Sequence, residues 1–267
     1  MKLKRNQALI IILVLLLQII VFSCGKKEDM PHMSVMPQIE GAELEFRGFV
    51  ADDEDELLSD IHKFSRRVVH KDTIDHKVIH YYISSNQRTP FYTDKEGTVW
   101  ERQTEDVSVR MSMYGYFPVT PIKLSYWKAL LKVDSGVGSQ WEVNIDTTFQ
   151  AKDIEGKKHV LRYVHQGKAR NEGWTTAFIP EVYQYVDAVD AHWYELNTFL
   201  INETSGDSLY ISRGTAHQYF EPKLGAIKYI TDFIQKEQGK EPISLHGTWE
   251  LLGQNIPEQN NHIIVVK

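Results

Sequence analysis

Hydrophobic and polar residues alternate along much of the chain, which is the pattern of a strand with one buried face. The clearest stretch begins at Trp141. Its odd-numbered positions up to Phe149 are apolar or β-branched, and the even-numbered positions from Glu142 to Thr148 are polar. Because successive side chains of a strand point to opposite faces, this segment is predicted to be a half-buried antiparallel strand.

Short turn signals separate further segments of this kind, among them Asp94 to Gly97, Glu155-Gly156 and Ser205-Gly206-Asp207. Short connections favour antiparallel pairing of neighbouring strands. The glycine-flanked residues 167–173 are predicted to form an exposed loop. The sequence therefore predicts a mainly β fold, an antiparallel meander that forms a curved sheet, an open barrel or a sandwich. It occupies residues 41–267 as one domain or two sub-domains.

Two segments fit more than one element. Apolar residues from Leu57 to Val68 recur at helical spacing behind an acidic start at residues 52–56, so we expect one short helix near the beginning of the domain. Residues 224–233 match a helix and a strand equally well. Gly225 and the β-branched content favour a strand there.

The first 23 residues do not follow the strand pattern. Lys2, Lys4 and Arg5 precede an apolar run of about 15 residues that ends at Phe22. A spanning helix needs roughly 20 apolar residues, whereas a run of this length suits the core of a secretory signal. Residues 1–23 are therefore predicted to be a signal peptide that is removed.

The end of this segment, Val21-Phe22-Ser23-Cys24, resembles the lipobox of bacterial lipoproteins. That resemblance implies that Cys24 becomes the lipidated N-terminus, with acyl chains such as palmitate as the anchor. Cys24 is the one cysteine of the chain, so it has no partner for an internal disulfide. An ordinary signal peptide, with Cys24 incidental, is the alternative.

Residues 24–40 mix charges, prolines and methionines without periodicity, which predicts a flexible tether. Lys27-Glu28-Asp29 resembles the signal that displays Bacteroidetes lipoproteins on the outer face of the outer membrane. Two later stretches, Tyr116-Phe117-Pro118 and residues 220–229, resemble phrases in uncharacterised β-rich lipoproteins of that phylum. These resemblances imply a curved antiparallel sheet or open barrel, anchored at the outer membrane and displayed on either its inner or its outer face.

Charge narrows the range of partners. The chain carries a formal charge of −6, and loss of the signal peptide with its three basic residues leaves −9. An acidic body argues against nucleic acid and anionic lipid as direct partners.

No catalytic signature stands out. The chain has no G-x-S-x-G motif, and Gly136-Val137-Gly138 lacks the third glycine of a nucleotide loop. Ser125 and Lys128 form an S-x-x-K pair without the companion motifs of penicillin-recognising enzymes. The sequence therefore predicts no catalytic residue and no cofactor.

A metal site is not expected either. His70, His76 and His80 cluster in the sequence, but their segment is predicted to be a strand. Four residues along a strand span about 13 Å, too far for one ion. We expect these histidines to be solvated.

Aromatic residues are the remaining candidates for binding. They could stack sugars or line an apolar cavity, although sheet packing uses the same residues. The set comprises Tyr114, Tyr116, Phe117, Tyr126, Trp127, Tyr183, Tyr185, Trp193 and Tyr194.

These observations favour a lipid-anchored, non-enzymatic binding or accessory protein of the envelope. Its expected partners are the membrane, through lipid on Cys24, and an envelope protein, a glycan or an apolar ligand. A lipocalin-like or glycan-binding module with an aromatic-lined pocket is the alternative. A hydrolase with a site assembled from distant residues is a third.

Overall fold

The structure is a computed structural model that describes residues 31–52, 57–58, 61–133, 136–179 and 184–257. Pro31–Lys267 form one compact unit. The predicted signal peptide, Cys24 and the Lys27-Glu28-Asp29 signal lie outside the described residues.

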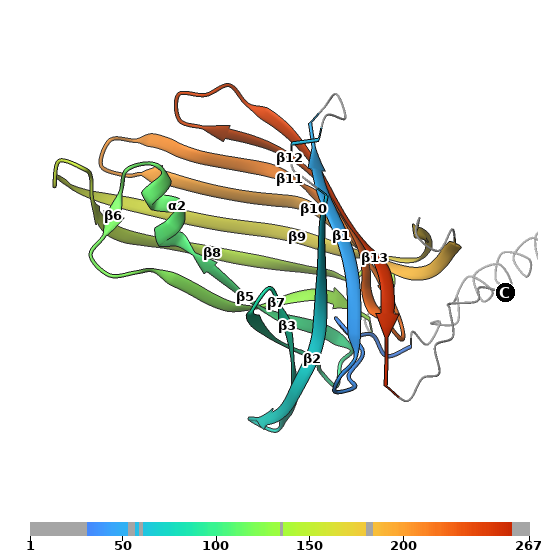
Figure 1. Ribbon diagram of the computed structural model, residues 1–267. Helices are drawn as coiled ribbons and strands as arrows, with labels where there is room; N and C mark the ends of the chain where they lie inside the picture. The colour runs from blue at the N-terminus through green and yellow to red at the C-terminus, as the bar shows by residue number, and fades with distance from the viewer. Residues whose placement is uncertain (1–30, 53–56, 59–60, 134–135, 180–183, 258–267) are drawn as a thin grey trace, which may run out of the picture. The chain divides into compact units, whose positions relative to one another are not determined.

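The described part of the chain folds into one antiparallel sheet of thirteen strands, so the mainly β, curved architecture is confirmed (Figure 1). The strand order is β6-β8-β9-β10-β11-β12-β13-β1-β2-β3-β4-β5-β7. The strands are β1 (Glu43–Ala51), β2 (His62–Ile74), β3 (Lys77–Ser84), β4 (Gln87–Thr93), β5 (Thr98–Asp106), β6 (Phe117–Pro118), β7 (Lys123–Lys132), β8 (Gln140–Lys152), β9 (Lys158–Ile179), β10 (Gln184–Asn202), β11 (Asp207–Glu221), β12 (Gly225–Glu237) and β13 (Ile243–Asn255).

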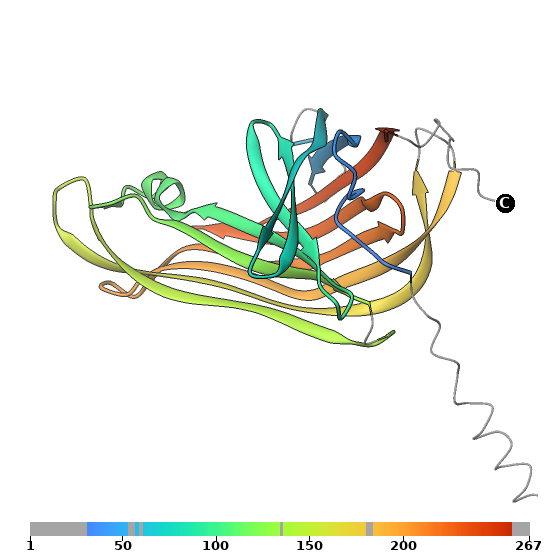
Figure 2. The same cartoon turned by 90° about the horizontal axis from the view of Figure 1, so that it is seen from below.

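Most predicted turns and strands are found where the sequence places them. The alternating segment from Trp141 lies within β8, and residues 224–233 are in strand conformation from Gly225 onward. Gly156 and Gly206 both have a positive φ in the turns on either side of the long strands β9 and β10. Figure 2 shows the yellow and orange strands of this region curving along their length.

The predicted loop at residues 167–173 is wrong, because these residues continue the 22-residue strand β9. Gly167 is there for packing. A Cβ at this position would lie 2.8 Å from the Leu196 side chain and 2.9 Å from the Trp193 ring. The glycine therefore admits a large side chain of β10 against the sheet.

Curvature brings the two ends of the sheet toward each other. Register shifts mark a bulge in β9, where Glu172 is skipped opposite Asp190 and Ala191, and a bulge in β10 between Trp193 and Glu195, and bulges bend a strand. The last strand in the order, β7, consequently lies near β8 and β9. Its Lys128 lies over the ring of Trp193, with 4.1 Å between the ammonium nitrogen and the ring centroid.

The predicted helix over residues 57–68 is also wrong in its described part, since β2 begins at His62. Phe64, Arg66 and Val68 alternate along β2 on the face of the sheet that packs inward. The charge of Arg66 on that face hides the strand period in the sequence. The helix of the described chain is α2 (Val107–Met113), capped by the Asp106 side chain, which accepts from Val109 N at 3.2 Å.

Apolar side chains pack at the end of the sheet that α2 covers. Val107 and Met111 of α2 pack in a cluster with buried side chains of β8 to β11, among them Leu161 and Leu200. Elsewhere, the Met33 carbonyl accepts from the Thr93 hydroxyl of β4, and the Val35 carbonyl accepts from the Ala226 amide of β12.

The segment that precedes β1 therefore connects two strands that are distant in the strand order. Met33, Val35 and Met36 are fully buried. The expectation of a flexible tether up to residue 40 does not hold for these residues.

Gly167→Ala tests the packing of β9 against β10. Trp193 is only 1 % exposed and has no room to retreat, so the added methyl overpacks the contact. Overpacking costs about 1–3 kcal/mol, which lowers Tm by about 3 to 10 °C in a domain of this size. In the control variant Gly253→Ala, the new Cβ meets only a Glu45 carboxylate oxygen at 3.6 Å. Thermal unfolding of both variants checks this, and an equal Tm in the two would contradict the packing role.

Candidate functional site

The curved sheet contains an interior cavity of about 200 Å³. Its walls combine aromatic rings with charged side chains drawn from seven strands that are far apart in the sequence. The lining residues are Phe46, Phe64, Arg66, Glu101, Gln103, Lys128, Leu130, Gln218, Ala226, Lys228, Tyr229 and Trp249.

One wall is aromatic. Phe46 of β1 pairs with Phe64 of β2, and their rings stack at 5.3 Å. Trp249 of β13 meets Phe64 edge-on at 5.3 Å and lies beside Tyr229 of β12. Gly48, opposite Trp249, leaves the space for that indole, because a Cβ there would be 2.6 Å from the ring.

Arg66 extends over this aromatic wall. Its guanidinium carbon lies 5.2 Å from the Phe46 ring centroid, 5.8 Å from Phe64 and 5.1 Å from Tyr82, within the range of cation–π attraction. Its Nε is buried and has no hydrogen-bond partner in the structure. Within the described residues Arg66 forms no ion pair, so its charge has no carboxylate partner there.

Glu101 is the carboxylate among the described lining residues, and the protein already satisfies it. The Tyr82 hydroxyl donates to one oxygen at 2.9 Å, and the Gln103 amide donates to the other. Burial, with the Glu101 charge beside it, raises the pKa of Tyr82 well above its ordinary value, so this phenol remains a donor. Glu101 has therefore lost much of its capacity to accept from a ligand.

Lys128 is paired with Glu101 across β5 and β7, and its ammonium lies over the Trp193 ring. Burial lowers the pKa of Lys128 to about 8, although the nearby Glu101 and Glu105 carboxylates act in the opposite direction. At neutral pH the group is still a cation. Among the described residues it forms no ion pair, because no carboxylate oxygen lies within 4.0 Å of its ammonium nitrogen.

Two further titratable side chains, His165 and Glu105, lie within the influence of the Lys128 and Arg110 charges. Burial, followed by the charges of Lys128 and Arg110, lowers the pKa of His165 to about 4, so this imidazole is neutral. Burial raises the pKa of Glu105, against the influence of Arg110 and Lys128. Glu105 accepts from the Tyr163 hydroxyl and lies 3.9 Å from Arg110. Glu105 is thus paired with protein groups and does not belong to the cavity lining.

A second hollow of about 490 Å³ adjoins the cavity, because both are lined by Phe64, Arg66 and Trp249. Its other residues come from the ends of β1 to β3 and include Gly48 and Ser85. Trp249 is 42 % exposed, which places its ring at the boundary with solvent. The three shared residues therefore lie between the cavity and this more exposed hollow.

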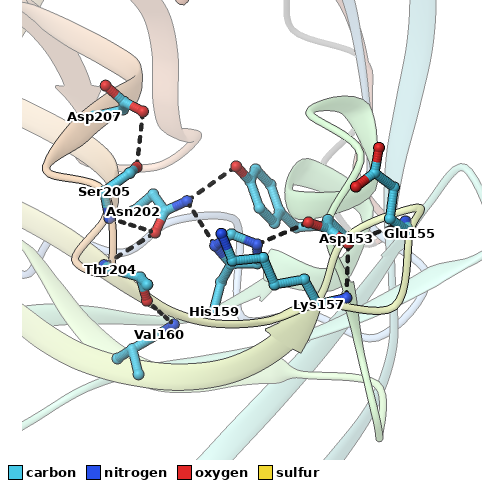
Figure 3. Close-up of polar contacts among 10 residues, drawn as sticks. Asp153, Glu155, Lys157, His159, Val160, Asn202, Thr204, Ser205 and Asp207 are labelled. Atoms are coloured by element: carbon cyan, nitrogen blue, oxygen red, sulfur yellow. Dashed lines mark hydrogen bonds and ion pairs between the residues drawn. The ribbon is translucent and has the colours of Figure 1, made fainter.

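A different polar cluster lies at the turns that join β8 to β9 and β10 to β11 (Figure 3). His159 Nε2 is 2.9 Å from Asp153, and its Nδ1 is 3.1 Å from the Asn202 amide nitrogen. Both ring nitrogens are occupied, and the Ser205 hydroxyl donates to Asp207 at 2.7 Å. Since no ring nitrogen is left to activate a nucleophile, the cluster fastens two neighbouring turns to each other.

Another histidine cluster crosses β9 to β11. The rings of His192 and His217 stack at 4.1 Å, and each bonds a carboxylate, Glu172 at 3.1 Å and Asp190 at 2.8 Å. Burial raises the pKa of Asp190. Because His192 adjoins the inward-pointing Trp193 in β10, this cluster lies on the face opposite the cavity.

The sequence motifs do not assemble into a site. Ser125 and Lys128 are three residues apart on a strand and therefore point to opposite faces, and Ser125 accepts from Arg102 Nε at 2.7 Å. His70 and His76 are exposed, as expected. His80 is not solvated: it is 7 % exposed and stacks on Phe91, so that expectation is wrong.

Of the nine aromatic candidates, Trp193 and Tyr126 point to the interior near Lys128 and His165. Trp127 packs edge-on against Tyr92 on the other face, and Tyr185 is 62 % exposed. Tyr183 lies outside the described residues. The aromatic cavity wall was not anticipated, because its four rings come from β1, β2, β12 and β13.

Across the described residues, no group of three or more histidine, cysteine, aspartate or glutamate side chains is arranged to hold a metal ion. No helix in that part of the chain has the length and apolarity to cross a membrane.

Known proteins give little guidance on this site. No protein-family model matches the sequence, and no curated protein matches it significantly. One solved structure is similar, that of a provisionally assigned lipoprotein from Parabacteroides distasonis. It shares 13 % identity and a TM-score of 0.42 over 85 % of this chain and 100 % of that chain. At this similarity it identifies neither a family nor a function.

Lys128→Met is expected to stabilise the protein at neutral pH. The folded-state pKa of Lys128, about 8, lies below its ordinary value of 10.5, so burial of the cation opposes folding below pH 8. This cost is about 3 kcal/mol and disappears as pH rises from about 8 to about 10.5. Loss of the contact with Trp193 offsets part of the gain.

The variant should therefore unfold about 2 to 4 °C above wild type at pH 7. Thermal unfolding between pH 7 and pH 10 should show this difference shrinking as pH rises. Lys123→Met, an exposed position on the same strand, serves as the control without a pH-dependent difference. A difference between Lys128→Met and wild type that is constant across this range would contradict the buried-cation account.

Proposed function

We propose that this protein is a lipid-anchored, non-enzymatic envelope protein that binds a small molecule inside its curved sheet. The observation that carries the proposal is the cavity, in which aromatic rings surround the guanidinium of Arg66, and this cation forms no ion pair with a described residue. Ligand sites are concave, largely apolar and supplied with a few convergent polar groups, and this cavity has that composition. Small-molecule binding is thereby favoured over a role as a purely surface-bound accessory subunit.

The chemistry of the lining supports binding without turnover. Among the described lining residues, Glu101 is held by two donors and no serine, threonine or histidine is present. A general base needs a free acceptor within reach of the reacting proton, and a nucleophile needs an adjacent base. The described lining residues supply no serine, threonine, cysteine or histidine and no free carboxylate, and Lys128, the remaining candidate, is a cation at neutral pH.

The anchor rests on the sequence. The lipobox resemblance ends at Cys24, the one cysteine of the chain, and Lys27-Glu28-Asp29 follows it. Acyl chains on Cys24 would hold the body at the outer membrane, and the charged signal favours display at the cell surface.

A screen of small ring compounds by thermal shift tests the binding role on the purified full chain. At least one compound should raise Tm, because a ligand that binds only the folded state stabilises it. Ala226→Phe should abolish the shift by filling the cavity, whereas Ile234→Phe, at an exposed position of the same strand, should leave it unchanged. No stabilising compound, or an undiminished shift in Ala226→Phe, would sink the proposal.

Cys24→Ser tests the anchor. The variant should accumulate as a precursor or as soluble protein, while the wild type fractionates with membranes and incorporates radiolabelled palmitate. Ser23→Ala retains a small residue before the cysteine and should behave as wild type. Unlabelled wild type whose fractionation matches that of Cys24→Ser would refute lipidation.

A further inference from the structure

Charge balance in the cavity points to the sign of its ligand. Three cations and one carboxylate belong to the lining residues, and one of the cations, Lys228, lies 3.4 Å from Glu250 and donates to the Phe178 carbonyl at 3.1 Å. Arg66 and Lys128 remain, opposed by Glu101 among the lining residues and by Glu105 beside Lys128, which Arg110 at 3.9 Å partly balances. Uncompensated positive charge in a poorly solvated site favours an anionic partner.

Hydrogen-bond capacity points the same way. Glu101 already accepts from Tyr82 and Gln103, so it offers little to a cationic or hydroxylated ligand. Arg66 has a buried Nε that donates to nothing in the described chain. That Nε is enclosed by the protein, so an acidic group in the cavity would be held by the charge of the guanidinium and by the part of Arg66 that lines the cavity.

Size and lining define the rest of the ligand. An engineered cavity of about 150 Å³ holds benzene, so about 200 Å³ admits one ring with a small substituent. The faces of Phe46 and Phe64 and the edge of Trp249 offer flat contacts to such a ring. The adjoining hollow of about 490 Å³ leaves room for a larger body outside.

From these features we infer that the cavity binds an organic anion, a ring-sized molecule whose carboxylate or phosphate group is held by Arg66, with Lys128 adding long-range attraction. The inference rests on the proposed binding function and specifies the class of its ligand. Arg66 is the specificity-determining residue, because its planar fork matches the two oxygens of an acidic group and its charge is permanent.

Isothermal titration of the purified full chain with four matched probes tests the inference. Benzoate and phenyl phosphate are the anionic probes and separate a carboxylate from a phosphate ligand. Benzyl alcohol and benzylamine are the neutral and cationic probes. At pH 7, at least one anion should bind tenfold or more tightly than benzyl alcohol, and benzylamine should bind most weakly.

Variants locate the interaction. Arg66→Met should weaken binding of the better anion at least tenfold and leave benzyl alcohol unaffected, while Arg66→Lys should retain part of the affinity. Arg67→Met, at the adjacent exposed position, is the control. Anion affinity of the wild type should fall between pH 7 and pH 9 as Lys128 loses its proton, and this fall should be absent in Lys128→Met.

Circular dichroism and Tm establish that each variant is folded before titration. Equal or tighter binding of benzyl alcohol or benzylamine by the wild type would overturn the anion inference while leaving small-molecule binding intact. Unchanged anion affinity in folded Arg66→Met would overturn the role of Arg66. Failure of every ring compound to bind, in this series and in the wider screen, would instead remove the proposed function itself.

Discussion

The contact between Lys128 of β7 and the ring of Trp193 in β10 joins two strands that are separated by most of the sheet. A twisted antiparallel sheet of this many strands tends to curl, and packing between its separated strands fixes how far it does so. The buried indole of Trp193 provides the packing surface between them, Trp141 supports it edge-on at 6.0 Å, and Gly167 provides the space beneath it. Curvature of the sheet, and hence the cavity, depends on this packing.

The same contact determines the electrostatics of the interior. A cation is held on the inner face with Glu101 and Glu105 nearby, and its charge lowers the pKa of His165 and counteracts the burial of Glu105. Arg66 adds a second cation on the opposite wall, stabilised by aromatic rings instead of a carboxylate. The interior is therefore both aromatic and electropositive, although the chain as a whole is acidic.

Local patterns in the sequence predicted the fold class well, because alternation and turn residues act over a few positions. The strand at Trp141 and the turns at Gly156 and Gly206 are examples. Prediction failed where tertiary packing overrides local pattern. Gly167 suggested a loop, but its lack of a side chain makes room for the buried Trp193 indole. The charged Arg66 lies at an inward position of β2, which interrupted the alternating pattern and led to the prediction of a helix.

The cavity could not be predicted in the same way, since Phe46, Arg66, Glu101, Lys128 and Trp249 meet only through long-range strand pairing. One signal was present: arginine at an inward position between Phe64 and Val68. A charge on a buried face requires a partner or a specific role.

A crystal structure of the full chain grown with 4-bromobenzoate tests the central claim most directly, because anomalous scattering locates bromine independently of the protein. The account predicts one bromine peak among Phe46, Phe64 and Trp249, with the carboxylate in contact with the Arg66 guanidinium. Bromine found only on the outer surface, or a cavity filled by protein side chains, would contradict it.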